Sequence, residues 1–215
     1  MSRVENAQGE TMKGVVAMRN YSVTIAREYG SGGRLIGKRL AQELGISFYD
    51  RELIAIVARE SGLDEDFVET IEQKKTPGGL YGFFVAGGVL PIHEQVFIAQ
   101  SNAIRDLAER KSCVFIGRCA DYALSGMKNC IRVFIYAPME FRVKITREEY
   151  REGGDVPESF IRKQDKCRAS YYNFFTQWRW GRAQNYNLCL DSSIGVQASV
   201  RLLKKFVEEF MGGND

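Results

Sequence analysis

The sequence has very few residues that could bind metals or form cross-links. Its 215 residues include one histidine, His93, and five cysteines without a C-x-x-C pair. Zinc sites and disulfide frameworks need such residues in closely spaced groups, so neither is expected, and the cysteines should be reduced and mostly buried. No uninterrupted apolar run reaches the length of a transmembrane helix. The net charge of +3 is too small to indicate nucleic acid as a partner.

The composition and length are those of one soluble domain. Hydrophobic residues make up 45% of the sequence and charged residues 27%. A single core with a small appended lid accounts for the length. Residues 1–18 hold only a short apolar patch, where a secretory signal needs a longer one, so we expect a cytoplasmic protein with a loosely held N-terminal tail. The single domain is then expected over 19–215.

Short β-rich runs alternate with helical patterns along the chain. This alternation predicts an α/β fold with a five-stranded, mainly parallel sheet flanked by helices. The expected strands are 21–26, 46–49, 113–117, 131–137 and 187–191. Apolar stripes at helical spacing predict helices from Gly33 or Arg34 to Gly45 and over about 92–110, 139–152 and 196–210.

The stretch "EYGSGGRLIGK" (28–38) offers two registers for a phosphate loop. The literal pattern G-x-x-x-x-G-K ends at Lys38, but a helix that began there would keep only about two turns before Gly45. In the other register the first strand ends near Arg27, the loop is 28–33, and the helix follows directly. We favour this second register because it places the early apolar residues on the helix.

In the favoured register, six consecutive residues are expected to bind nucleotide phosphate, partly through backbone N–H groups at a helix N-terminus. They are Gly30, Ser31, Gly32, Gly33, Arg34 and Leu35. Gly33 replaces the lysine of an ordinary phosphate loop, so another cation must lie near the transferred phosphoryl group. Arg34 is the first candidate for this catalytic role and Lys38 the second. A glycine-rich turn with solvated basic residues is the plain alternative.

Four motifs resemble those of the cytidylate kinase-like nucleoside monophosphate kinases, a P-loop branch with a degenerate phosphate loop. They are "VTIAREYGSGGRLIGKRLA", "FYDRELI", "VFIGRCADYAL" and "DKCRASYY", and the resemblance covers about 21–210. It implies ATP and Mg²⁺ as cofactors and transfer of the γ-phosphate to a nucleoside monophosphate, CMP or dCMP. Two alternatives stay open: a P-loop kinase for another small metabolite, and a non-catalytic nucleotide sensor.

The resemblance also implies roles for individual residues. Arg118, Arg142 and Arg168 match arginines that contact phosphate, and we expect them to be catalytic together with Arg34. The acceptor is expected to meet Asp50, Arg51, Arg118, Asp165 and Arg168, with Asp165 reading the nucleoside. In true cytidylate kinases the acceptor-side helix carries a serine and an arginine, which Arg51 and Ile56 replace here.

The usual Mg²⁺ ligands of a phosphate loop are incomplete in this sequence. Leu35 removes the loop hydroxyl, so Ser31 is the expected substitute. Asp121, near the end of the third strand, is the expected carboxylate, with Asp50 as the other candidate. Either aspartate could instead cap a helix, a common role of this residue type.

Two further segments border the predicted site. Six arginines on broken helical patterns predict a lid over about 141–186 that closes on nucleotide; they are Arg142, Arg147, Arg162, Arg168, Arg179 and Arg182. An acceptor-side helical segment is expected over about 51–91. Its end, 76–91, is apolar with five glycines and could be buried, dimer-facing or substrate-facing. We expect small nucleotides as partners and no membrane, while a homodimer stays open.

Overall fold

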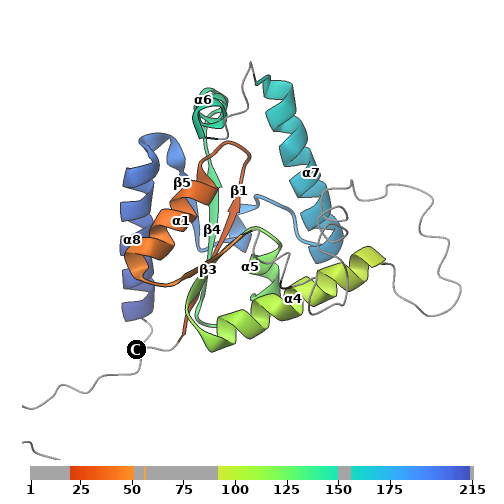
Figure 1. Cartoon of the computed structure of the whole chain (residues 1–215), viewed down its shortest axis with the longest axis vertical. Coiled ribbons are helices and arrows are strands. Elements are labelled where there is room, and N and C mark those ends of the chain that lie inside the picture. Colours follow the sequence, from red (N-terminus) through yellow and green to blue (C-terminus); the bar gives the residue numbers. More distant parts are fainter. Residues whose placement is uncertain (1–19, 51–55, 57–91, 150–155, 214–215) are drawn as a thin grey trace, which may run out of the picture.

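The structure is a computed structural model that describes residues 20–50, 56, 92–149 and 156–213 (Figure 1). The predicted N-terminal tail, Arg51, and nearly all of the acceptor-side segment 51–91 lie outside the described residues. No described helix is both long enough and apolar enough to cross a bilayer.

Five strands form one sheet in the order β2-β3-β1-β4-β5, and every pairing between them is parallel. The strands are β1 (Ser22–Arg27), β2 (Ser47–Tyr49), β3 (Cys113–Ile116), β4 (Cys130–Tyr136) and β5 (Leu188–Asp191). The predicted α/β fold with a five-stranded parallel sheet is therefore confirmed, and each expected strand agrees with the observed one to within a residue at either end.

Helices cover both faces of this sheet and its carboxyl edge (Figure 1). They are α1 (Gly33–Leu44), α4 (Ile92–Arg110), α5 (Ala120–Ala123), α6 (Met139–Glu149), α7 (Glu158–Thr176) and α8 (Val196–Gly212), with 3₁₀ turns η2 (Ala183–Asn185) and η3 (Ser192–Ile194). Helices α1 and α8 pack side by side on one face, while α4 and α5 lie on the other. Helix α6 sits beyond the carboxyl ends of the strands, and α7 descends from there.

The chain ends α1 with a glycine, as predicted. Gly45 has a φ of 65°, a left-handed conformation in which glycine carries no steric penalty. Its backbone N–H turns back to the carbonyl oxygens of Ala41 and Gln42. The helix therefore stops cleanly before β2.

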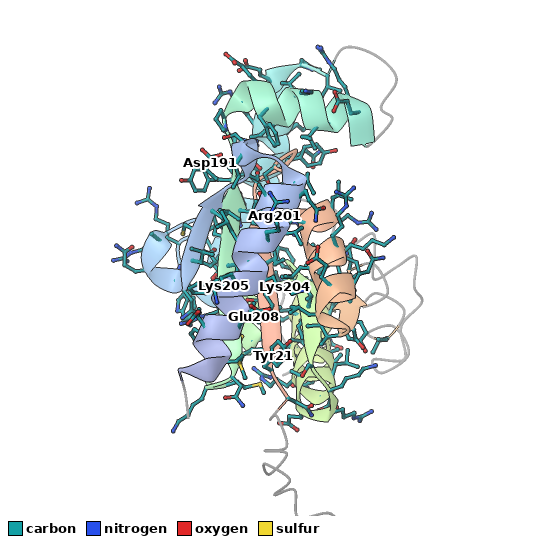
Figure 2. All side chains as sticks on the ribbon, turned by 90° about the vertical axis from the view of Figure 1, so that its left-hand side faces the viewer. Tyr21, Asp191, Arg201, Lys204, Lys205 and Glu208 are labelled. Atoms are coloured by element: carbon teal, nitrogen blue, oxygen red, sulfur yellow. The ribbon has the colours of Figure 1, made fainter. Side chains whose placement is uncertain are left out.

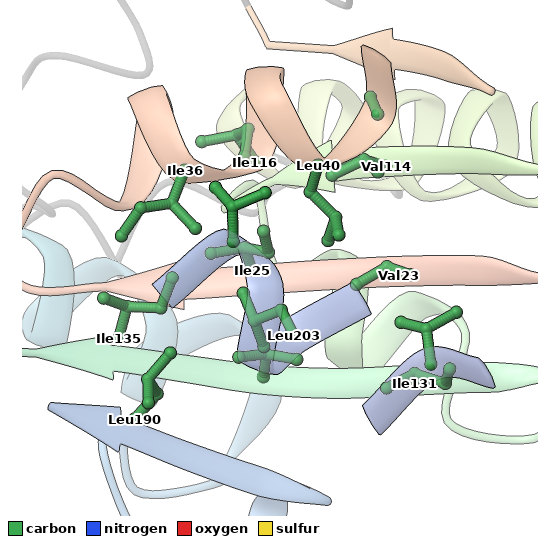
Figure 3. Packing of buried hydrophobic residues seen from close by; sticks show 14 of the residues in the cluster. Val23, Ile25, Ile36, Leu40, Val114, Ile116, Ile131, Ile135, Leu190 and Leu203 are labelled. Carbon is green, nitrogen blue, oxygen red and sulfur yellow. The ribbon is translucent and has the colours of Figure 1, made fainter. Parts of the chain in front are cut away.

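The main core lies between the sheet and α1 and α8. It is built from branched aliphatic side chains of the central strands, packed against Ile36 and Leu40 of α1 and Leu203 of α8 (Figure 3). Figure 2 shows the opposite side of α8, where Arg201, Lys205 and Glu208 are exposed. This division into an apolar and a charged stripe explains why the last helix could be predicted from its periodicity.

Candidate active site

The glycine-rich loop leaves the central strand of the sheet. Strand β1 ends at Arg27 and α1 begins at Gly33, so 28–32 joins the strand directly to the helix. The favoured loop register is thereby confirmed. Strand β1 lies between β3 and β4, where the chain crosses from one half of the sheet to the other. Open parallel sheets bind ligands at such crossovers, outside the carboxyl ends of the strands.

The shape of the loop depends on its glycines. Gly30 and Gly32 have φ angles of 75° and 73°. A Cβ at Gly30 would lie 2.5 Å from the Arg142 carbonyl oxygen and 2.6 Å from Thr146 Oγ1, so only glycine fits beneath α6. A Cβ at Gly33 would lie 2.8 Å from the Cβ of the strand's last residue, Arg27. The backbone is therefore tightly enclosed on two sides.

Ser31 is fully buried within this loop. Its Oγ donates to the Glu28 carbonyl oxygen at 2.9 Å, and its own carbonyl oxygen accepts from Ser192 Oγ at 2.6 Å. The hydroxyl thus stabilises the turn in this structure. Its predicted role as a ligand of Mg²⁺ stays a prediction.

Arg34 and Asp50 form an ion pair in which Arg34 Nε donates to Asp50 Oδ2. The Arg34 side chain is 47% exposed, whereas that of Asp50, just after β2, is 8% exposed. The pair therefore connects the N-terminus of α1 to the carboxyl end of β2, and it brings together two residues that the sequence placed in the site. Lys38 is exposed one turn further along α1.

Arg142 of α6 is buried, with 5% of its surface exposed, and it points into the loop. Its Nε donates to the Tyr29 carbonyl oxygen at 2.7 Å, and its Nη2 pairs with Asp165 Oδ2 of α7. Its Nη1 lies 3.4 Å from Glu28 Oε2. Asp165 Oδ1 in turn accepts from the Tyr29 N–H at 2.7 Å. Burial raises the pKa of the Glu28 carboxyl, and the positive charge of Arg142 partly opposes this rise.

The other two predicted arginines are Arg168 of α7, which borders the loop, and Arg118, which follows β3. Arg168 Nη1 donates to the Arg27 carbonyl oxygen at 3.3 Å, and its guanidinium carbon lies 5.1 Å from the centre of the Tyr29 ring. Arg118 follows β3 with a φ of 58°, and its carbonyl oxygen accepts from Gln100 Nε2 at 2.8 Å. Phosphate contact by either residue stays a prediction.

Asp121 lies deeper than its predicted role suggests. Its Oδ2 accepts from the Tyr172 hydroxyl at 2.7 Å, and only 3% of its surface is exposed. Burial raises the pKa of Asp121, and the hydrogen bond from Tyr172 opposes part of that rise. Cys119 occupies the N-cap position of α5 but makes no side-chain hydrogen bond there. Asp121 lies in the first turn of the helix, where its carboxylate accepts from the backbone N–H groups of Asp121 and Tyr122, so it serves the N-terminus of α5 from inside the helix.

A protein-bound cation would have few side-chain ligands among the described residues. Among them, no group of three or more histidine, cysteine, aspartate or glutamate side chains is arranged to hold a metal ion. Mg²⁺ in kinases keeps several waters and takes one or two protein oxygens together with substrate phosphates. Asp50, which contacts the first residues of α1 through Arg34, and Ser31 could supply such oxygens, and ligation by Asp121 stays a prediction.

Sequence reasoning assigned no individual role to three residues that shape the site. Arg27, Glu28 and Tyr29 immediately precede the glycines, and the Arg27 guanidinium lies against Gly117 after β3. Their position in the sequence could have identified them. Residues between a buried strand and a glycine-rich turn lie at the carboxyl edge of the sheet, where open parallel sheets bind ligands.

Comparisons with known proteins agree with this geometry. Residues 22–194 match the model of the cytidylate kinase-like family. An uncharacterized protein from Eubacterium ventriosum ATCC 27560 has a similar crystal structure, with 28% identity, a TM-score of 0.66 and coverage of 88% of this chain and 99% of that one. No curated protein matches the chain.

Two kinases share the fold at low identity. A gluconokinase from Sinorhizobium meliloti 1021 is 14% identical with a TM-score of 0.57, covering 91% of this chain and 97% of its own. A shikimate kinase from Bacteroides thetaiotaomicron is 13% identical with a TM-score of 0.53, covering 87% and 98%. The architecture is therefore that of the P-loop kinases.

Proposed function

The chain belongs to the cytidylate kinase-like family, and we propose that it transfers the γ-phosphate of ATP to a nucleoside monophosphate, with CMP or dCMP as acceptor. The observation that carries this proposal is the glycine-rich loop that joins β1 to the N-terminus of α1 at the carboxyl edge of the sheet. A phosphate bound there would meet backbone N–H groups and the positive end of the helix dipole.

The chemistry of phosphoryl transfer suits the residues around this loop. The reaction requires that two phosphates be held in line and that their charge be neutralised, with little covalent help from the protein. Arg34 supplies a permanent positive charge at the start of α1, and Asp50 orients its planar guanidinium by engaging Nε. Mg²⁺, when bound, would neutralise part of the phosphate charge; Ser31, Asp50 and Asp121 are the residues proposed to hold it.

On the acceptor side we propose that Arg118 and Arg168 contact the phosphate. Arg168 lies beside the loop, where its contacts to the Arg27 carbonyl and the Tyr29 ring place its charge. Guanidinium groups suit this role because they bind phosphate oxygens in a bidentate geometry.

One observation favours a second candidate acceptor, a different small phosphorylated or hydroxylated metabolite. Ile56 replaces an arginine of true cytidylate kinases, and its side chain packs against the cluster that contains Tyr49 and Phe115. An apolar, packed side chain cannot bind a polar acceptor group. The base specificity of the family therefore need not extend to this chain.

Turnover measurements with a panel of acceptors test the proposal. The purified protein, with ATP and Mg²⁺, should form ADP and a nucleoside diphosphate from CMP or dCMP, detected by phosphorus NMR. Transfer only to a non-nucleotide acceptor would select the second candidate. Tight ATP binding without transfer to any acceptor would favour a non-catalytic nucleotide sensor over a kinase.

Two variants on the same helix test the role of Arg34. Losing a transition-state phosphate contact costs a few kcal/mol, so Arg34→Ala should lower kcat/KM by roughly two to three orders of magnitude. Lys38→Ala, a matched loss of charge one turn away, should lower it by about tenfold or less. Thermal melting checks that both variants fold. If Lys38→Ala abolished activity and Arg34→Ala did not, Lys38 would be the catalytic cation.

A further inference from the structure

We propose that Arg142 and Asp165 form a clamp that fixes the phosphate loop to α6 and α7, and that they position ATP rather than contact the acceptor. This inference rests on the proposed function, because it concerns the same loop. It assigns both residues a different task from the phosphate and nucleoside contacts that the family resemblance implies.

The clamp holds both backbone hydrogen-bonding groups of one loop residue. The Tyr29 N–H donates to Asp165 Oδ1, and the Tyr29 carbonyl oxygen accepts from Arg142 Nε, each at 2.7 Å. The two side chains are themselves an ion pair. Since the N–H and the carbonyl belong to successive peptide planes, both planes are fixed immediately before Gly30, the first glycine of the turn.

Each of the three nitrogens of Arg142 already faces a protein acceptor in this arrangement. Its Nε contacts Tyr29, its Nη2 contacts Asp165, and its Nη1 contacts Glu28. The Glu28 carboxylate also accepts from the Ala137 N–H at 3.2 Å, which holds it in place. The guanidinium is also buried, and its charge is already paired with two carboxylates, which favours a structural role over a contact with a ligand phosphate.

Helix α6 completes the clamp by packing directly against the loop at Gly30. Thr146 Oγ1 donates to the Arg142 carbonyl oxygen at 2.7 Å, and these two oxygens occupy the space that a side chain at Gly30 would need. Helix α7 also contacts the Tyr29 ring through Phe160, in an edge-to-face arrangement with 5.5 Å between the ring centroids. The loop is therefore held by side chains, by backbone and by an aromatic contact.

This arrangement couples the loop to the two helices. If α7 moved away from the loop, Asp165 would leave the Tyr29 N–H and Arg142 would lose its partner. The loop would then be free to take other conformations, and fewer molecules would present its N–H groups to a phosphate. By reciprocity, ATP binding should stabilise the docked position of α7.

Nucleotide binding without an acceptor tests the clamp separately from turnover. Asp165→Asn keeps the size and one acceptor oxygen but removes the charge that pairs with Arg142. We expect it to weaken ATP binding roughly tenfold to a hundredfold in calorimetric titrations, as loss of positioning does. The acceptor KM should change by less than about threefold. Glu158→Gln, which breaks an exposed ion pair with Arg162 on the same helix, is the control and should change neither quantity.

The opposite pattern, an unchanged ATP affinity with a raised acceptor KM, would overturn the clamp and restore the contact with the acceptor. If no monophosphate is a substrate, the proposed function fails, but the ATP titrations still test the clamp. The two failures can therefore be told apart. Hydrogen exchange provides a test that needs no ligand and no variant. The Tyr29 amide should be protected in the free protein, and an amide that exchanges as fast as an open loop would also overturn the clamp.

Discussion

The two faces of the sheet are built from different kinds of side chain. Toward α1 and α8 the strands present branched aliphatic residues, such as Val23 and Ile25 of β1. Toward α4 and α5 the same strand presents Ser22 and Thr24, and β3 presents Cys113 together with the aromatic Phe115. The second face also contains the hydrogen bond between Asp121 of α5 and Tyr172 of α7.

This difference separates two tasks. Aliphatic packing favours folding without directional demands, because burial of apolar surface is non-directional. Buried polar groups are stable only when their partners are in place, so they fix how neighbouring elements sit. On the second face they connect α5 to α7, the helix that also carries Asp165 to the phosphate loop. We call this second face the polar face because Ser22, Thr24 and Asp121 are buried there, beside the apolar Phe115 and Leu124. It is the face through which the core can hold α7.

The largest effect is expected from truncating the aliphatic face. Ile25 is fully buried between the sheet and α1. Ile25→Ala removes packed carbons and leaves a cavity, so the free energy of unfolding should fall by about 2–5 kcal/mol. Cys113→Ala at a buried position of the other face should lower it by about 1 kcal/mol. Urea denaturation measures both values, and equal losses would show that the two faces are packed alike.

A smaller effect is expected on the polar face. Tyr172→Phe keeps the ring but removes the hydroxyl that donates to Asp121, which leaves a buried carboxyl without this donor. The free energy of unfolding should fall by about 1–3 kcal/mol. Tyr136→Phe, at a position that is 40% exposed, is the matched control and should change it by less than about 0.5 kcal/mol. A loss no larger than that of the control would mean that the link between α5 and α7 does not contribute to stability.

The aliphatic face is also the part that could be predicted from the sequence. Its signal is local: Val23 and Ile25 alternate within one strand, and Ile36 and Leu40 repeat at helical spacing within one helix. The loop register could be predicted for a similar reason. The number of residues between Arg27 and Gly45 is small, so α1 must begin early to have enough turns.

The contacts of the site could not be predicted in the same way. The resemblance selected Arg142 and Asp165, but their partner Tyr29 is 113 and 136 residues away in the sequence. Contacts over such separations depend on how the helices dock on the sheet, and no local pattern specifies this. Asp121 shows the same limit, because a carboxylate near a strand end is identical in sequence whether it faces Mg²⁺ or a buried tyrosine.

Asp121 offers the finest test of the polar face, through the pH dependence of stability. Burial raises its pKa above the ordinary value of 3.8. A raised pKa in the folded state means that the native protein binds this proton more tightly than the unfolded chain does. The resulting stabilisation is complete below about pH 3.8 and is lost as the pH rises through the folded-state pKa.

Asp121→Asn removes this titration while its side-chain oxygen can still accept from the Tyr172 hydroxyl. The difference in unfolding free energy, variant minus wild type, should therefore increase as the pH is raised from about 4 toward neutral. Urea denaturation at several pH values measures it, with Asp106→Asn at an exposed position of α4 as the control. A difference that decreased instead would show that the ionised carboxylate is favoured in the folded protein, as the nearby positive charge of Arg132 would promote.

Added Mg²⁺ separates the two roles of Asp121. If Asp121 ligates the cation, the Asp121→Asn variant should need more Mg²⁺ for half-maximal activity. If Asp121 only holds α7 through Tyr172, the Mg²⁺ requirement should equal that of the wild type.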